Sequence, residues 1–333
     1  MVWGCLGWLF TTTVACSAPT PPALGGALDR GPALYEDEDI SGAALHDGAL
    51  YVVSDEGNVL LRLSPVDGGW ARDAAWTLPD LTPTTDRRAS DDAPELDLEA
   101  VSPAPGGVVV IGSHGARRKT VADDRSYAKN WKRLATVDAE PRRRFAAHVV
   151  FDGGTPTLAA QWDFGTSLQD HPLIGRFMGL PSKENGVDIE GVAVVDGWLY
   201  LGLRGPVLRG GWAVVLSTPL DMAPALTTTA TLPLDGLGIR DLAAVDGGFL
   251  VLGGPMGDGP GDHPIWFWSG TDCMVGEGAP GCTLTQVATL PTRSDARAEA
   301  LAVLAADGGG WQVLVAWDGV TGGAGELKRV PKP

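Results

Sequence analysis

The chain has 333 residues, long enough for two average domains or for one large ring or barrel domain. Its 25 basic and 41 acidic residues give a formal charge of −16, which argues against nucleic acid or an anionic membrane surface as the main partner, because both require a net basic footprint. The 46 glycines and 25 prolines favour many short strands joined by tight turns over long helices.

The N-terminal residues have the pattern of an export leader. Residues 2–15 are apolar or hydroxylated and uncharged, a length that suits a signal peptide and falls short of a membrane span. We expect residues 1–18 to be the leader and residues 19–23 a tether, with export to the periplasm, the cell envelope or the medium. Val14-Ala15-Cys16 resembles a bacterial lipobox, in which Cys16 is lipidated and supplies the only expected membrane contact. Cleavage after Ala18 is one alternative, and a buried N-terminal strand without export is the other.

A pattern of a polar start, a small-residue strand, a glycine turn and a second apolar strand occurs five times in the rest of the chain. The segments begin at Asp39, Asp97, Asp188, Gly238 and Arg297. Their alignment places five residues at one equivalent position, in steps of 58, 91, 50 and 59 residues: Ser41, Glu99, Glu190, Arg240 and Glu299. Repeated hairpins of this kind predict an all-β fold, a β-propeller of five four-stranded blades, or six if the longest step hides another blade.

We expect a single propeller domain over residues 24–333. A polar insert at about 115–143 interrupts the second blade, and the segment 166–186, with a short helix, precedes the third. The last repeat has only three strands before the chain ends. Its fourth strand is therefore expected from residues 24–36, which would close the ring and leave no open sheet edge.

Two cysteines lie outside the leader. Cys273 and Cys282 bracket MVGEGAPG, a glycine- and proline-rich loop that can fold back on itself. In an oxidising compartment this spacing predicts a disulfide. Two thiols without a nearby histidine pair make a poor zinc site.

The hairpin geometry predicts where a ligand binds. The start of each hairpin's first strand and the end of its second strand lie on the same rim of the ring. The first set holds Asp39, Asp97, Glu99, Asp188, Glu190, Asp241 and Glu299, and the second holds Asp55, Glu56, His114, Arg204 and Asp318. A ring of carboxylates is unfavourable unless a cation or hydrogen bonds offset it, and oxygen ligands suit Ca²⁺. The candidate metal ligands are Asp97, Glu99, Asp188, Glu190 and Glu299. In the alternative interpretation, Arg240 neutralises these carboxylates and no ion is needed.

The insert is the second notable feature. Residues 117–144 contain ten of the 25 basic residues and only four acids. Next to His114, and with Arg204 and Arg209 on the same rim, this island is suited to a phosphate, sulfate or carboxylate group. The alternative is a solvated loop that only balances the surface charge.

The absence of common motifs narrows the chemistry. The sequence has no G-x-S-x-G elbow, no P-loop and no H-E-x-x-H, and its five histidines are scattered. No nucleotide or flavin cofactor is indicated, and no catalytic residue can be named. Any catalysis would be metal-assisted hydrolysis.

Several motifs in order carry a resemblance to a known family: DLEAV, IGSHG, ENGVDIEGVA, LYLGLRGPVLRGGWAVVL and GLGIRDLAAVDGG. Over residues 35–320 the chain resembles the bacterial domain of unknown function 3616. The resemblance implies a β-propeller distantly similar to the phytase-like esterase and calcium-binding periplasmic groups, and no established activity. The motif residues it implies are Glu99, His114, Glu190, Arg204, Arg209, Arg240 and Asp241. Ser41 departs from the pattern in the first blade.

Three functions remain open. The leading hypothesis is an exported, monomeric propeller that binds a small anionic or metal-bridged ligand on the rim through His114, Arg204, Arg209, Arg240 and Asp241. The second is a Ca²⁺-dependent phosphoric- or carboxylic-ester hydrolase. The third is a non-enzymatic envelope scaffold that docks proteins. The fold does not decide among them, because one fold hosts many functions.

Overall fold

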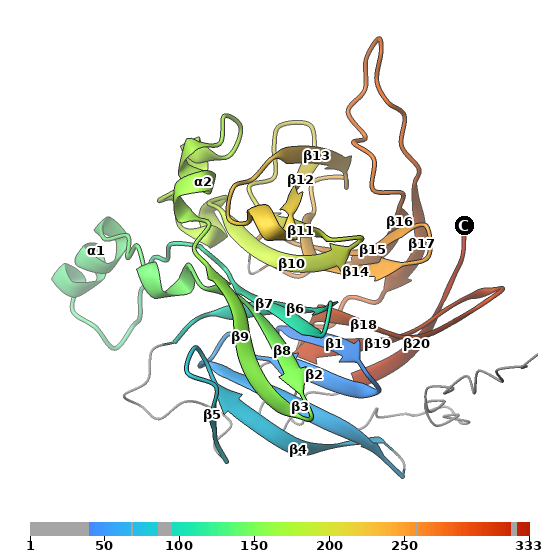
Figure 1. Cartoon of the computed structure of the whole chain (residues 1–333). Helices are drawn as coiled ribbons and strands as arrows, with labels where there is room; N and C mark the ends of the chain where they lie inside the picture. Colours follow the sequence, from blue (N-terminus) through green and yellow to red (C-terminus); the bar gives the residue numbers. More distant parts are fainter. Residues whose placement is uncertain (1–39, 68, 86–94, 258, 321–324) are drawn as a thin grey trace, which may run out of the picture.

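The computed structural model describes residues 40–67, 69–85, 95–257, 259–320 and 325–333. Within these residues the chain forms five antiparallel sheets arranged as a ring (Figure 1). The predicted all-β, five-bladed propeller is confirmed. The predicted leader, the tether and the closing strand at 24–36 lie outside the described residues.

Each sheet corresponds to one sequence repeat, and its strands pair in chain order. Blade one contains β1 (Gly42–His46), β2 (Ala49–Val53), β3 (Val59–Val66), β4 (Gly69–Thr77) and β5 (Thr82–Pro83). Blade two contains β6 (Leu98–Ala104), β7 (Gly107–Gly112), β8 (Ala146–Asp152) and β9 (Thr155–Trp162). Blade three contains β10 (Asp188–Val195), β11 (Trp198–Gly205), β12 (Trp212–Pro219) and β13 (Thr228–Pro233). Blade four contains β14 (Gly238–Val245), β15 (Gly248–Gly254), β16 (His263–Trp268) and β17 (Leu284–Leu290). Blade five contains β18 (Arg297–Asp307), β19 (Gly310–Asp318) and β20 (Gly325–Pro331).

The first strand of every blade contacts the first strand of the next, and β18 returns to contact β1. These five strands therefore form the innermost layer of a closed ring. Tight turns make the inner hairpins possible. Asp47-Gly48 and Asp196-Gly197 both adopt the left-handed conformation, with φ of 47° and 76° in the first turn and 50° and 76° in the second. Such Asp-Gly turns match the twist of antiparallel strands.

The hydrophobic core lies between neighbouring blades. Five buried clusters occupy the five blade junctions, each made from the facing apolar side chains of two adjacent sheets. At the junction of blades four and five, for example, Leu250 and Ile265 pack in one cluster with Trp311 and Trp317. Burial of this kind contributes about 25 cal/mol per Å² of apolar surface, so the blades stabilise one another.

All but one of the helical segments in the described residues occur within the single 91-residue step between Glu99 and Glu190. The insert of blade two contains α1 (Tyr127–Ala135) and η1 (Pro141–Arg143). The segment before blade three contains α2 (Gly165–Asp170), η2 (Gly175–Phe177) and η3 (Ser182–Glu184), which confirms the predicted short helix there. A single turn, η4 (Leu220–Met222), follows β12. None of the helices in the described residues is long and apolar enough to cross a membrane.

The predicted disulfide is present. Cys273 and Cys282 are bonded, with their Cα atoms 5.1 Å apart, in the connection between β16 and β17. Figure 1 shows this connection as a long excursion from the ring. Cys273 is buried against the core shared by blades three and four, so the bond ties the excursion to that junction.

Candidate functional site

A β-bulge in the innermost strand of four blades sets the position of the site residues. In blade three, Ile189 pairs with Leu203 and Gly191 with Gly202, so Glu190 is skipped in the ladder. The register shifts at the same place in blades two, four and five and skips Glu99, Arg240 and Glu299. A bulge bends its strand and re-aims the extra side chain. Here all four bulged residues are buried and line one cavity.

Two arginines pair with the carboxylates of blades three and five. Arg204 contacts both Asp188 and Glu190, the latter at 2.5 Å. Arg240 contacts Glu190 at 2.9 Å and also pairs with Glu299. These side chains therefore form one continuous chain of charges across three blades, in which Glu190 accepts from two guanidinium groups.

A third arginine belongs to blade two. Arg143, at the end of η1, pairs with Asp97 at 2.8 Å and with Glu95 at 2.7 Å. The hydroxyl of Ser113 also donates to Asp97. We did not single out Arg143 from the sequence, because it was only one of the ten basic residues of the insert. Its place directly before the strand that pairs with β7 was the available signal.

Glu99 differs from the other carboxylates of this group. Its side chain is 9% exposed, and within the described residues it has no ion pair or hydrogen bond. One carboxylate oxygen each from Glu99, Asp188 and Glu190 lie within 4.8 Å of one another. Oxygens that share a Ca²⁺ ion, each about 2.3–2.6 Å from it, are at most about 5 Å apart. The three carboxylates are therefore close enough to hold one such ion.

The surroundings oppose the charged forms of these carboxylates. Burial raises the pKa of Glu190 to about 8, although Arg204 and Arg240 pull it down. Burial likewise raises the pKa of Asp97 and of Glu299 to about 7, against the attraction of Arg143 and Arg240 respectively. Burial and the neighbouring carboxylates both raise the pKa of Glu99 well above its ordinary value. A proton or a cation relieves this penalty.

The cavity that these residues line has a volume of about 1230 Å³. Its floor comprises the bulged residues with Asp97, Asp188, Arg143 and Arg204, and the strand-end residues Asp55, Glu56 and Asp318 also line it. Most of the residues expected on one rim by hairpin geometry thus meet at one cavity, whereas Asp241 and His114 do not line it. Asp97 and Glu299 line it too but are not in the three-carboxylate group.

The insert provides the basic part of the cavity wall. Arg117, Arg118 and Lys119 line it, and each is paired with a carboxylate: Arg117 with Glu140 at 2.5 Å, Arg118 with Glu184, and Lys119 with Asp138 at 3.5 Å. The basic island is therefore partly balanced by acids. These pairs are partly exposed, and exposed pairs are weak enough to exchange for a ligand.

Three of the predicted rim ligands are not among the residues that line this cavity. His114 is 3% exposed and is used structurally, with Nδ1 on the carbonyl of Gly112 and Nε2 accepting from the N–H of Phe164. Asp241 accepts from the N–H groups of Leu242 and Leu301, and so joins blade four to blade five. Arg209 is exposed beyond the end of β11.

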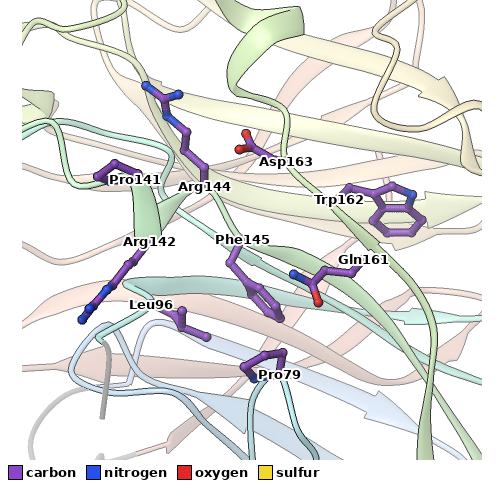
Figure 2. Close-up of a pocket in the computed structure, with 9 residues that line it drawn as sticks. All are labelled: Pro79, Leu96, Pro141, Arg142, Arg144, Phe145, Gln161, Trp162 and Asp163. Atoms are coloured by element: carbon purple, nitrogen blue, oxygen red, sulfur yellow. The ribbon is translucent and has the colours of Figure 1, made fainter. Parts of the chain in front are cut away.

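A second depression lies between blades one and two, outside the central cavity (Figure 2). It has a volume of about 550 Å³, with Leu96, Phe145 and Trp162 among its apolar lining. Arg142 and Arg144 lie beside it, but Figure 2 shows their side chains pointing in different directions. They do not form a joint clamp for an anion there.

The comparisons with known proteins concern the whole ring. The model of a protein family described as "Protein of unknown function (DUF3616)" matches residues 39–324. No curated protein is similar enough in sequence to count as a relative. Among similar solved structures, glutaminyl cyclase of Myxococcus xanthus is 9% identical, with a TM-score of 0.47 over 91% of this chain and 94% of that one. The PQQ-bound aldose sugar dehydrogenase of Streptomyces coelicolor is 14% identical, with a TM-score of 0.41 over 93% and 98%. No activity is carried over from proteins this distant.

Proposed function

Because the chain belongs to the DUF3616 family, whose description names no activity, we propose a function from the site itself: the central cavity binds a divalent cation, and through it a small anionic ligand. The cation ligands are Glu99, Asp188 and Glu190. The observation that carries the proposal is Glu99, a buried carboxylate beside two others that has no ion pair or hydrogen bond among the described residues.

The charge balance of the floor supports a divalent ion. Five buried carboxylates (Asp97, Glu99, Asp188, Glu190 and Glu299) line the cavity together with three arginines (Arg143, Arg204 and Arg240), whose side chains are 12% exposed or less. When all are ionised, two negative charges are left over. One divalent cation cancels that excess, and uncompensated buried charge is strongly destabilising.

The donor set favours Ca²⁺ over a transition metal. All three donors are carboxylate oxygens, and hard oxygen ligands suit Ca²⁺ and Mg²⁺, whereas zinc and copper prefer nitrogen and sulfur. Ca²⁺ takes about 6–8 oxygens, and one oxygen from each of the three carboxylates supplies three of them. The remaining positions are available to oxygens of a ligand in the cavity.

The rest of the cavity fits an anionic ligand. At about 1230 Å³ it exceeds the ~300–1,000 Å³ of common ligand pockets. Arg117, Arg118 and Lys119 line the wall contributed by the insert. A ligand with carboxylate or phosphate groups would place one oxygen group on the cation and another against these residues.

Calorimetric titration of the full chain with CaCl₂ tests the proposal. We expect one Ca²⁺ per chain and loss of this binding in Glu99→Gln, which keeps the shape of the side chain and removes its charge. Glu299→Gln is the matched control, because it removes one charge from the same floor outside the three-carboxylate group. Equal Ca²⁺ binding by wild type and Glu99→Gln would refute the proposed site.

A second titration tests the ligand. We expect inorganic phosphate to bind the Ca²⁺-loaded chain more tightly than the chain in EDTA, because the cation supplies the attraction. Equal phosphate affinity with Ca²⁺ and with EDTA would refute the proposal that the cation bridges the ligand. It would not contradict the proposed cation site itself.

A further inference from the structure

The helix α1 of the insert is largely exposed. Figure 1 shows it standing away from the blades. None of its nine residues is buried. The side chains of Tyr127, Trp131 and Leu134 are 79%, 57% and 45% exposed. Their spacing of four and three residues places them on one face of the helix, where Tyr127 and Trp131 contact each other edge to face.

Despite this exposure, α1 is held in a fixed place. Ser126 caps its N-terminus by accepting from the N–H of Lys129 at 3.3 Å. Asn130 exchanges two hydrogen bonds with the backbone of Ala122, and Arg118 donates to the carbonyl of Leu134 while it pairs with Glu184. A helix this short is marginal in isolation, and here polar tethers replace the apolar packing that stabilises most protein helices. Its apolar face is therefore presented outward rather than used for folding.

The charge of α1 is opposite to that of the whole chain. The helix contains Lys129, Lys132 and Arg133 and no acid, on a chain of formal charge −16. Within the described part of the chain, Lys129 and Lys132 have no ion pair, whereas Arg133 donates to the carbonyl of Thr120. Lys129 and Lys132 are thus able to meet an anionic surface.

We infer that α1 docks on an anionic lipid surface, with Tyr127, Trp131 and Leu134 inserted at the level of the headgroups. Aromatic residues beside lysines are typical of helices that lie in a membrane interface, where the ring is apolar and its polar edge stays hydrated. Lys129 and Lys132 lie on the opposite, polar face of the helix, as in other interfacial helices, and their long side chains extend toward the lipid phosphates.

The acidity of the chain does not prevent this contact. At physiological ionic strength the screening length is about 8 Å, so carboxylates on the far side of the ring act weakly on a surface that touches α1. The net negative charge of the chain therefore does not prevent α1 itself from contacting an anionic membrane. Because Arg133 and Leu134 also line the central cavity, docking would hold its wall near the lipid headgroups.

Co-sedimentation of the full chain with vesicles tests the inference. We expect binding to vesicles of phosphatidylcholine mixed with phosphatidylglycerol, loss of most of it at high salt, and little binding to phosphatidylcholine alone. The triple variant Tyr127→Ser, Trp131→Ser, Leu134→Ser should lower the bound fraction about tenfold. The control variant Met222→Ser, Val275→Ser removes comparably exposed apolar groups from other places and should bind as wild type does. Equal binding by the triple variant and wild type would overturn the proposal.

A fluorescence measurement separates α1 from the N-terminal apolar stretch, which contains Trp3 and Trp8. Brominated phosphatidylglycerol quenches tryptophan that enters the interface. Quenching that is reduced in Trp131→Phe supports docking through α1. Quenching that is unchanged in Trp131→Phe assigns the contact to another segment and overturns the proposal.

Discussion

Glu190 and Arg240 occupy the same position in two successive blades, and their side chains form an ion pair of 2.9 Å. Both are bulge residues of an innermost strand, skipped in the ladder with the neighbouring strand. The bulge turns each side chain into the central cavity, where a repeat position held by glutamate in one blade meets arginine in the next. This repeat position thus supplies one of the three arginines that pair with the buried carboxylates of the cavity.

Loss of Arg240 should destabilise the ring. Arg240→Met keeps the aliphatic length but leaves Glu190 and Glu299 without their shared partner, and breaking a buried pair in this way typically costs about 3–5 kcal/mol. Urea unfolding in EDTA measures the loss. Arg329→Met is the control, because Arg329 pairs with Asp307 at the exposed end of blade five and should change stability by less than about 1 kcal/mol. Similar losses in both variants would contradict the assigned role of Arg240.

Loss of the Glu99 charge should have the opposite effect when no cation is present. Burial and the neighbouring carboxylates raise the pKa of Glu99, so its ionised form is unfavourable in the folded chain. Glu99→Gln should therefore raise the free energy of unfolding in EDTA by about 1 kcal/mol. Adding Ca²⁺ should then stabilise wild type and not the variant. A variant less stable than wild type in EDTA would show that the Glu99 carboxylate is compensated by other means.

Asp241 should act on stability and not on ligand binding. Its two oxygens accept from the backbone of its own blade and of blade five, at 2.7 and 2.6 Å. Asp241→Asn replaces one acceptor with a donor that faces an N–H group, which should cost about 1–3 kcal/mol. Asp246→Asn, on an exposed turn, is the matched control. The calcium affinity of Asp241→Asn should stay at the wild-type value. A loss of calcium affinity without a loss of stability would contradict this prediction and show that Asp241 takes part in calcium binding.

His263 should make the fold sensitive to acid. Its side chain is 3% exposed and neither ring nitrogen has a hydrogen-bond partner in the described residues. Burial, with Arg240 and Arg297 nearby, lowers its pKa to about 4. The unfolded chain then binds the proton more readily, so stability that is present above about pH 6.5 is lost as the pH falls toward 4.

The variant His263→Phe tests this assignment, because phenylalanine keeps the ring against Trp317 and cannot be protonated. We expect unfolding free energies at pH 7 that are equal to or above wild type, and a shallower decline between pH 6.5 and 4. An unchanged decline would place the acid sensitivity at other groups, such as His114, whose pKa burial also lowers to about 4.

The insert should be removable only in part. Arg117 and Asp138 form a two-way backbone bridge at its base, at 3.0 and 2.8 Å, whereas Arg143 belongs to the cavity floor. Replacing residues 119–136 with a short glycine-rich turn should preserve folding and calcium binding and abolish vesicle binding. Removing residues 117–144 instead should destabilise the chain, because it removes Arg143 and leaves the buried Asp97 without its ion-pair partner. Equal behaviour of the two deletions, by melting temperature, would contradict this division.

The sequence predicted the ring well because each blade repeats a hairpin and turn formed by residues that are close together in the sequence. Such a pattern can be recognised without knowing the structure. It also predicted that Glu99, Asp188 and Glu190 lie on one rim of the ring, because each stands at or near the start of an inner strand. Among the partners of the cavity carboxylates it singled out Arg240, which pairs with Glu190 and Glu299, but not Arg143. Arg143 reaches Asp97 from 46 positions along the chain, and Asp241 turned from the cavity to the backbone of blade five. Such choices depend on register shifts and on packing between blades, which hydrophobic periodicity does not encode.

The most direct test of the cation site is a crystal structure of the full chain grown with Ca²⁺, with anomalous scattering to identify the ion. The account predicts one peak in the central cavity, about 2.3–2.6 Å from carboxylate oxygens of Glu99, Asp188 and Glu190. No peak at this place, with the Glu99 carboxylate instead hydrogen-bonded to a neighbouring carboxylate, would contradict it, because a proton would then fill the role assigned to the ion.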